Sequence, residues 1–143
     1  MKIEKIFTAD QFTETKWDTA QVKADFANHF VAFVKAGFPQ SGFTKKFYTR
    51  LSMTFGHIAH FNREGFYSTF FMHTACKREF ILQSLRHPCY GQPEYTYCDV
   101  EREIQKWLMR NHVLSNITEE IEEERIAAEL AELARLKAKY PTA

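Results

Sequence analysis

Glycine and proline are scarce in this chain, with five glycines and four prolines among 143 residues. So few turn-forming residues argue against a fold of many short strands and favour long helices. Cysteine is scarce as well. Cys76, Cys89 and Cys98 are an odd number at no framework spacing, which argues against a secreted disulfide scaffold and leads us to expect a reducing, cytoplasmic setting.

Long apolar runs are also missing. No run of eighteen apolar residues occurs anywhere, so we expect no membrane-spanning helix and no membrane partner. The opening residues MKIEKIFTADQF contain no apolar core of an export signal. We therefore do not expect this chain to be exported.

Acidic residues almost disappear from the middle of the chain. Residues 35–90 carry two acidic groups against eight basic ones, whereas the whole chain has a net charge of only +1. This shortage disfavours acid–base chemistry by paired carboxylates, and no motif such as G-x-S-x-G marks a nucleophile. We therefore expect no catalytic residues and a non-enzymatic role. A zinc-dependent or cysteine-based enzyme is the rival interpretation.

Apolar residues are plentiful, at 45% of the chain with 15% aromatic, which is enough for one well-buried core. We predict a single domain over 1–143, all-α or nearly so: a compact bundle of four to five helices around an aromatic-rich helical hairpin. Residues 18–113 form the predicted helical core. Residues 1–17 fit either a short strand or one helical turn, and both alternatives stay open.

The first predicted helix begins at a capping-box pattern, in which Asp18 is followed by Gln21. Gly37 and Pro39 end it in the order that helix termini favour. Its apolar positions recur at helical spacing, at Val22, Phe26, Phe30, Phe33 and Val34.

The second and third predicted helices form the hairpin. Ser41 is the expected cap of the second helix, Asn62 caps the third, and Gly65 permits the tight turn between them. The third helix is expected over 64–85 and is apolar nearly all round, which indicates a central position. The apolar stripe of the second helix consists of Phe43, Phe47, Leu51, Phe55 and Ile58.

Two further helices follow a loop over 87–97 that contains two prolines, one glycine and three tyrosines. Asp99 is the expected cap of the fourth helix. Asn116 and Glu119 form another capping-box pattern and predict a last helix over 117–139, acidic at its start and basic at its end. We expect its narrow apolar stripe to dock either on the domain itself or on a partner helix, such as the same helix of a second copy in a homodimer. The stripe consists of Ile117, Ile121, Ile126, Leu130, Leu133 and Leu136.

Two groups of histidines and cysteines have the chemistry of metal ligands. His57 and His60 are three residues apart, as are His73 and Cys76, so each pair shares a helix face and the four side chains suit tetrahedral zinc. His87, Cys89 and Cys98 form a second, looser group, whose loop spacing fixes no geometry. The alternative is structural, with the histidines at the edge of an aromatic core. We expect no cofactor, with zinc as the candidate if one binds.

Basic residues interleaved with aromatic ones make up the candidate ligand-binding or partner-binding set. Cations beside exposed rings are what single-stranded nucleic acid, a nucleotide or another anionic ligand requires. Most phenylalanines fall on helical stripes, so the tyrosines are the rings free to bind. The predicted set comprises Lys45, Lys46, Arg50, Arg63, Tyr67, Lys77 and Arg78.

These patterns favour an intracellular regulator or inhibitor that binds a protein partner through the basic-aromatic surface, the last helix, or both. In length and in its lack of a catalytic pattern the chain resembles the small accessory and inhibitor proteins of phages and mobile elements, although no residue motif carries that resemblance. Nucleic-acid or nucleotide binding is the alternative function.

Overall fold

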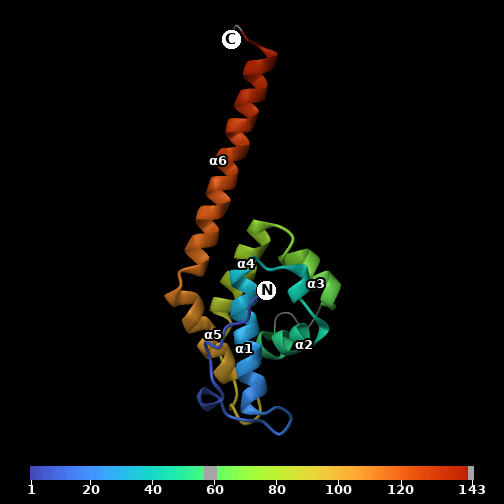
Figure 1. Cartoon of the computed structure of the whole chain (residues 1–143), viewed down its shortest axis with the longest axis vertical. Helices are drawn as coiled ribbons and strands as arrows, with labels where there is room; N and C mark the ends of the chain where they lie inside the picture. Colours follow the sequence, from blue (N-terminus) through green and yellow to red (C-terminus); the bar gives the residue numbers. More distant parts are fainter. Residues whose placement is uncertain (57–60, 142–143) are drawn as a thin grey trace.

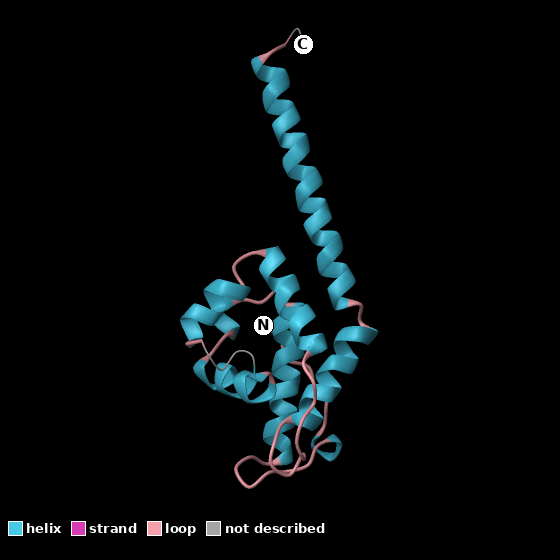
Figure 2. Cartoon of the chain, turned by 180° about the vertical axis from the view of Figure 1, so that it is seen from behind, coloured by secondary structure: helices cyan, strands magenta, loops and turns pink. Residues whose placement is uncertain are grey.

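The computed structural model describes residues 1–56 and 61–141, and these residues form helices and loops but no strand (Figures 1 and 2). The predicted all-α class is confirmed. The described residues contain six α-helices, more than the four to five expected. They are α1 (Ala20–Lys35), α2 (Lys45–Thr54), α3 (Arg63–Phe70), α4 (Thr74–Arg86), α5 (Cys98–Arg110) and α6 (Val113–Lys139), with short 3-10 turns at Ala9–Gln11 and Gln40–Gly42.

The extra helix arises because the predicted helix over 64–85 is broken. α3 ends at Phe70 and α4 starts at Thr74, with His73 in an extended conformation between them. The break turns Phe71 into the core, where its ring centroid lies 5.2 Å from that of Phe38 and 4.9 Å from that of Phe80. On one continuous helix Phe71 and Phe80 would point to opposite sides of the helix axis. Bringing both rings into one core therefore requires the chain to turn between them.

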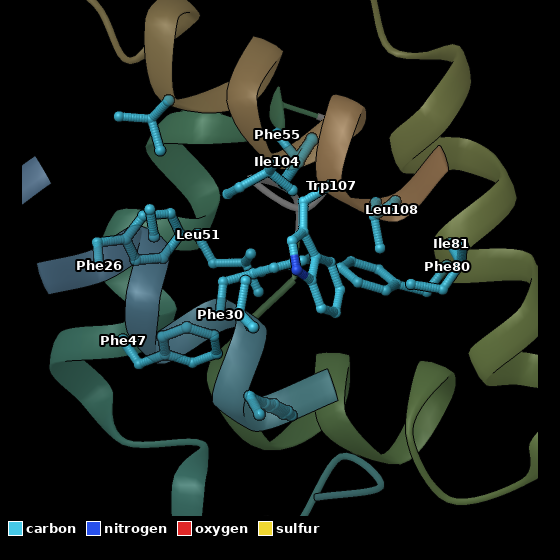
Figure 3. Close-up of a cluster of buried hydrophobic side chains, with 14 of the residues drawn as sticks. Phe26, Phe30, Phe47, Leu51, Phe55, Phe80, Ile81, Ile104, Trp107 and Leu108 are labelled. Atoms are coloured by element: carbon cyan, nitrogen blue, oxygen red, sulfur yellow. The ribbon is translucent and has the colours of Figure 1, made fainter. Parts of the chain in front are cut away.

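α1 runs through the middle of the domain, with α2 and α5 beside it (Figure 1). Its buried side chains meet rings from both halves of the chain. Phe33 packs on Phe47 at 5.1 Å and on Phe71 at 5.2 Å. Figure 3 shows Phe30 of α1 among aliphatic and aromatic side chains of α2, α4 and α5. The aromatic residues of the predicted hairpin are therefore mostly core.

The chain turns sharply after α1, as its glycine predicts. Gly37 adopts a left-handed backbone with φ +82°, and the next residue, Phe38, has φ +61°. The amide of Phe38 donates to the carbonyl of Phe33 at 2.9 Å, and that of Gly37 to Val34 at 3.1 Å. These bonds satisfy carbonyls that the helix end would leave open.

Several predicted caps lie one turn or less from the observed ones. Thr19, rather than Asp18, caps α1 by accepting a hydrogen bond from the amide of Val22. Thr44, rather than Ser41, caps α2. In both places the observed cap is a threonine directly before the helix, whose side chain accepts the backbone hydrogen bond that was expected of the predicted residue. Asn62 caps α3 as expected, its side chain accepting from the amide of Gly65 at 2.6 Å.

The start of α6 also differs from the prediction. α6 begins at Val113, directly after His112 in a left-handed conformation, so Asn116 lies inside the helix and does not cap it. The earlier start buries Val113 and Ile117 against the domain. Figures 1 and 2 show that the rest of α6 extends away from the other helices.

Candidate interaction surfaces

The predicted zinc ligands divide between described and undescribed parts of the chain. His57 and His60 lie outside the described residues. His73 is exposed and Cys76 is half-buried in the first turn of α4, where the Cys76 amide donates to the carbonyl of His73 at 3.0 Å. Within residues 1–56 and 61–141, no group of three or more histidine, cysteine, aspartate or glutamate side chains has the arrangement of a metal site. The zinc hypothesis for the four residues stays a prediction.

The second histidine and cysteine group joins the 87–97 loop to α5. Gly56 donates its amide to Nε2 of His87 at 3.2 Å, so Nδ1 carries the ring proton and bonds the buried carboxylate of Glu101. Cys89 donates to Gln105 at 3.4 Å. Burial raises the pKa of the Cys89 thiol, which keeps it protonated and weakens it as a nucleophile. Cys98 is buried and donates to the carbonyl of Gly91 at 3.5 Å.

Glu101 was missed in the sequence, although its position carried a signal. It stands three residues before Ile104 and seven before Leu108, in phase with the buried face of α5. Burial raises the pKa of the Glu101 carboxyl, and the hydrogen bond from His87 opposes that rise. A carboxyl at such a position anchors a neighbouring segment, which here is the loop that carries His87.

The basic-aromatic set does not line one cleft but is divided among several. Lys46 and Arg50 line one cleft, Arg63 and Tyr67 a second, and Lys77 a third. Arg78 points to α6, where its Nε donates to Oγ1 of Thr118 at 3.0 Å.

Several members of the set are held by contacts within the chain. The Tyr67 hydroxyl is buried and donates to the carbonyl of Phe38 at 2.7 Å. Nη2 of Arg50 donates to Oδ1 of Asp18 at 3.1 Å, and Arg63 lies beside Glu64 at the same distance. Lys77 donates to the carbonyl of Gly37 at 3.3 Å. Lys45 and Lys46 are exposed at the start of α2.

The first of these clefts lies between α1, α2 and the N-terminal segment, and we refer to it as the α1–α2 cleft. Its volume is 340 Å³, with Phe26 and Phe47 among its walls and Lys5, Lys46 and Arg50 as its cations. Asn28 fixes the N-terminal segment over it: Oδ1 accepts from the amides of Ile6 and Phe7, at 3.0 and 2.8 Å.

His29 forms part of the same cleft and was also missed in the sequence. Its ring stacks on Phe47 with centroids 4.2 Å apart, and Nε2 donates to the carbonyl of Gly42 at 2.8 Å. Burial lowers the pKa of His29, and the bond to Gly42 opposes that effect. At neutral pH the cationic character of the cleft therefore comes from its lysines and arginine.

The second surface is the far half of α6. Its apolar side chains are Ile126, Leu130, Leu133 and Leu136, and we call these four residues the α6 stripe. They are 45%, 60%, 47% and 40% exposed, respectively. The last residue of α6 that contacts another helix through a hydrogen bond, among the residues described, is Glu124, whose Oε1 accepts from Thr74 at 2.8 Å. The helix continues from there for about 22 Å at 1.5 Å per residue.

The α6 stripe does not continue the buried face of the same helix. Ile117 is buried and Ile121 is partly buried against the domain. At about 100° per residue, the centre of the α6 stripe lies roughly 140° around the helix axis from the face that holds Ile117 and Ile121. The single stripe expected from the sequence is therefore two stripes, and only the first docks on the domain.

Ionic contacts along α6 stabilise it as a free helix. Arg125 bonds Glu122 and also donates to Glu129 at 2.6 Å. Arg135 donates to Glu132 at 2.9 Å. Pairs three and four residues apart support a helix without tertiary packing, and the acidic start and basic end suit the helix dipole.

Comparisons with protein-family models, with curated proteins and with solved structures found no match. No helix in the described part of the chain is both long and apolar enough to cross a membrane. The two surfaces described above are therefore the features of the molecule from which a function can be inferred.

Proposed function

We propose that this chain is a non-enzymatic interaction protein in which α6 is a docking arm for a helical segment of a protein partner. The observation that carries this proposal is the exposure of the α6 stripe: four large aliphatic residues on one face of a helix that extends beyond the domain. Such side chains gain free energy when a second apolar surface covers them.

Several reactive groups in the described part of the domain are used in packing, which suits this role. The imidazole of His87 and the thiol of Cys89 bond to α5. The hydroxyl of Tyr67 bonds to the loop after α1. Groups engaged in this way hold the domain together, and the domain serves as a rigid base for α6.

We place this role in the cytoplasm, as a regulator or inhibitor of its partner. The three cysteines are free thiols, and two of them donate hydrogen bonds in their reduced form. Free thiols persist in a reducing compartment.

Face-specific crosslinking in cells tests the proposal. A photoreactive p-benzoylphenylalanine replaces Leu133 in the α6 stripe in one variant and Ala131 in another. Ala131 is also exposed and lies nearly opposite Leu133 on the helix. We expect a discrete adduct from position 133 that disappears when Leu130→Glu is added, and none from position 131. Equal adducts from both positions, or none from either, would contradict a docking arm.

The α1–α2 cleft favours a second candidate function, binding of a small anionic ligand such as a nucleotide. Its 340 Å³ volume falls within the range of ligand sites, and Lys5 and Lys46 stand beside an apolar wall. We expect Lys5→Glu/Lys46→Glu to abolish retention on an immobilised nucleotide, with Lys35→Glu/Lys45→Glu, two lysines outside the cleft, as the matched control. Retention unchanged in the cleft variant would exclude this candidate.

A further inference from the structure

We infer that the helix that docks on the α6 stripe is α6 of a second copy of this chain, running antiparallel. This inference rests on the proposed docking arm and names its partner. Two features of α6 point to it: the order of charges along the helix, and the positions of apolar and charged residues on either side of Leu133.

The charge order disfavours a parallel pair and favours an antiparallel one. Five glutamates lie between residues 119 and 124, whereas Arg135, Lys137 and Lys139 lie near the end of the helix. Two parallel copies would place acidic start beside acidic start. Reversing one copy brings basic end toward acidic start, which lowers the electrostatic free energy of the pair.

The α6 stripe is also self-complementary when one helix is reversed. With a two-fold axis at Leu133, Ile126 lies level with Tyr140 of the second copy, and Leu130 with Leu136 of the second copy. Tyr140 is itself 53% exposed at the C-cap of α6. Each apolar residue thus meets an apolar residue, as an isologous interface requires.

The charged residues within the same face obey the same symmetry. Glu129 and Lys137 are each four residues from Leu133, on opposite sides of it along the chain. In the antiparallel pair Glu129 lies level with Lys137 of the second copy. In a parallel pair Glu129 would lie beside Glu129 of the second copy and Lys137 beside Lys137, so that like charges repel.

The projection of α6 leaves room for this pairing. The last hydrogen bond described between α6 and α4 is at Glu124, and the α6 stripe begins two residues later on another face of the helix. In the antiparallel pair the end of the second helix lies beside Ile126, so the two domains stand at opposite ends of the overlap. Neither domain has to move for the helices to meet.

Sedimentation equilibrium of the full chain at micromolar concentrations tests the self-pairing. We expect a dimer whose dissociation constant rises at least about 100-fold in Leu133→Glu, equivalent to ~2.8 kcal/mol, because two leucines leave the interface and two carboxylates approach at the axis. Ala131→Glu is the matched control, since it adds the same charge on the opposite face, and we expect it to leave the constant within about threefold. A dimer unaffected by Leu133→Glu would overturn the inference.

Disulfide trapping tests the orientation. Ile126→Cys and Tyr140→Cys are oxidised separately and as a mixture, with the parent chain and its three cysteines as background. Antiparallel pairing predicts a disulfide-linked dimer in the mixture and none above background in either variant alone. A linked dimer in each variant alone would show parallel helices and overturn the inference.

The same measurements separate this inference from the docking arm itself. A chain that stays monomeric but still gives a face-specific adduct of another mass from position 133 would overturn self-pairing and leave the docking arm standing. A monomeric chain with no adduct from position 133 would overturn both.

Discussion

Replacing Lys23 by methionine tests how the domain is held together. Lys23 lies on α1 with its side chain fully buried, and its ammonium donates to Asp99 at 3.0 Å. It also donates to the carbonyls of Pro93 and Thr96, at 2.8 and 3.0 Å. One ammonium thus fastens the 93–99 segment to α1. Lys23→Met keeps the length of the aliphatic stem and removes all of these bonds.

The expected loss follows from what remains in the variant. Removing one partner of a buried ion pair costs roughly 3–5 kcal/mol, because the other charge stays buried. Asp99 keeps hydrogen bonds from the amides of Thr13 and Val100, both at 3.0 Å, which favours the lower end of that range. We therefore expect a loss of ~3 kcal/mol. With a urea dependence of ~2 kcal/mol/M, the midpoint falls by ~1.5 M.

Urea unfolding followed by tryptophan fluorescence, in which the environment of buried Trp107 changes most, measures this loss at pH 7. Lys35→Met is the matched control on the same helix: Lys35 and Glu4 lie 3.9 Å apart, with side chains 51% and 56% exposed. We expect the control to change stability by at most about 0.5 kcal/mol, as is usual for an exposed pair. If Lys23→Met lost no more stability than Lys35→Met, the structural role assigned to Lys23 would be refuted.

Three further predictions concern pH, backbone conformation and metal. Burial lowers the pKa of His29 from 6.5, so between pH 6.5 and the lowered pKa the unfolded chain binds a proton on this ring that the folded chain does not. The contribution of His29 to stability is therefore complete above pH 6.5 and falls as the pH drops toward the lowered pKa. We expect His29→Phe to reduce this acid-induced fall in thermal melting, and an unchanged pH slope would contradict the assignment. Gly37 has φ +82° with open space around it, so Gly37→Ala should cost ~1 kcal/mol through backbone strain alone; a neutral variant in urea unfolding would argue against that conformation. Elemental analysis of purified protein should find no stoichiometric zinc, whereas zinc that is lost in His73→Ala would favour the metalloenzyme interpretation.

The helical class could be predicted from the sequence because its signals are local. Scarce glycine and proline, apolar residues at helical spacing, and the cap at Asn62 all act within a few residues. The end of α1 is likewise marked by a local signal, the glycine at position 37. The break between α3 and α4 was not predictable in this way, since Phe71 turns inward to meet Phe80 and Phe38, and Phe38 is distant in sequence.

The predicted caps at Asp18 and Asp99 were displaced by long-range partners. The carboxylate of Asp18 accepts from Arg50 and from the hydroxyl of Tyr97, and that of Asp99 accepts from Lys23. These distant partners hold each carboxylate away from the cap position, and nothing in the local sequence reveals them.

The burial of two charged residues could have been predicted from their positions in the sequence. Lys23 stands three residues before Phe26 and seven before Phe30, in phase with the buried face of α1, and Glu101 has the same relation to Ile104 and Leu108. A charge in phase with an apolar stripe indicates a buried polar contact. Helical phase would likewise have divided the apolar residues of α6 into two faces. Nothing in the sequence indicated that the basic-aromatic set would be divided among several clefts, because that depends on how α2, α3 and α4 pack together.

Truncation within α6 tests the docking arm most directly. A chain ending at Glu124 keeps Val113 and Ile117 in the core and loses the α6 stripe, whereas a chain ending at Asn116 loses Ile117 as well. We predict that the chain ending at Glu124 keeps the urea midpoint of the full chain and loses all association, both with itself and with other proteins. The chain ending at Asn116 should be destabilised. Association that survives removal of residues 125–143 would contradict the account.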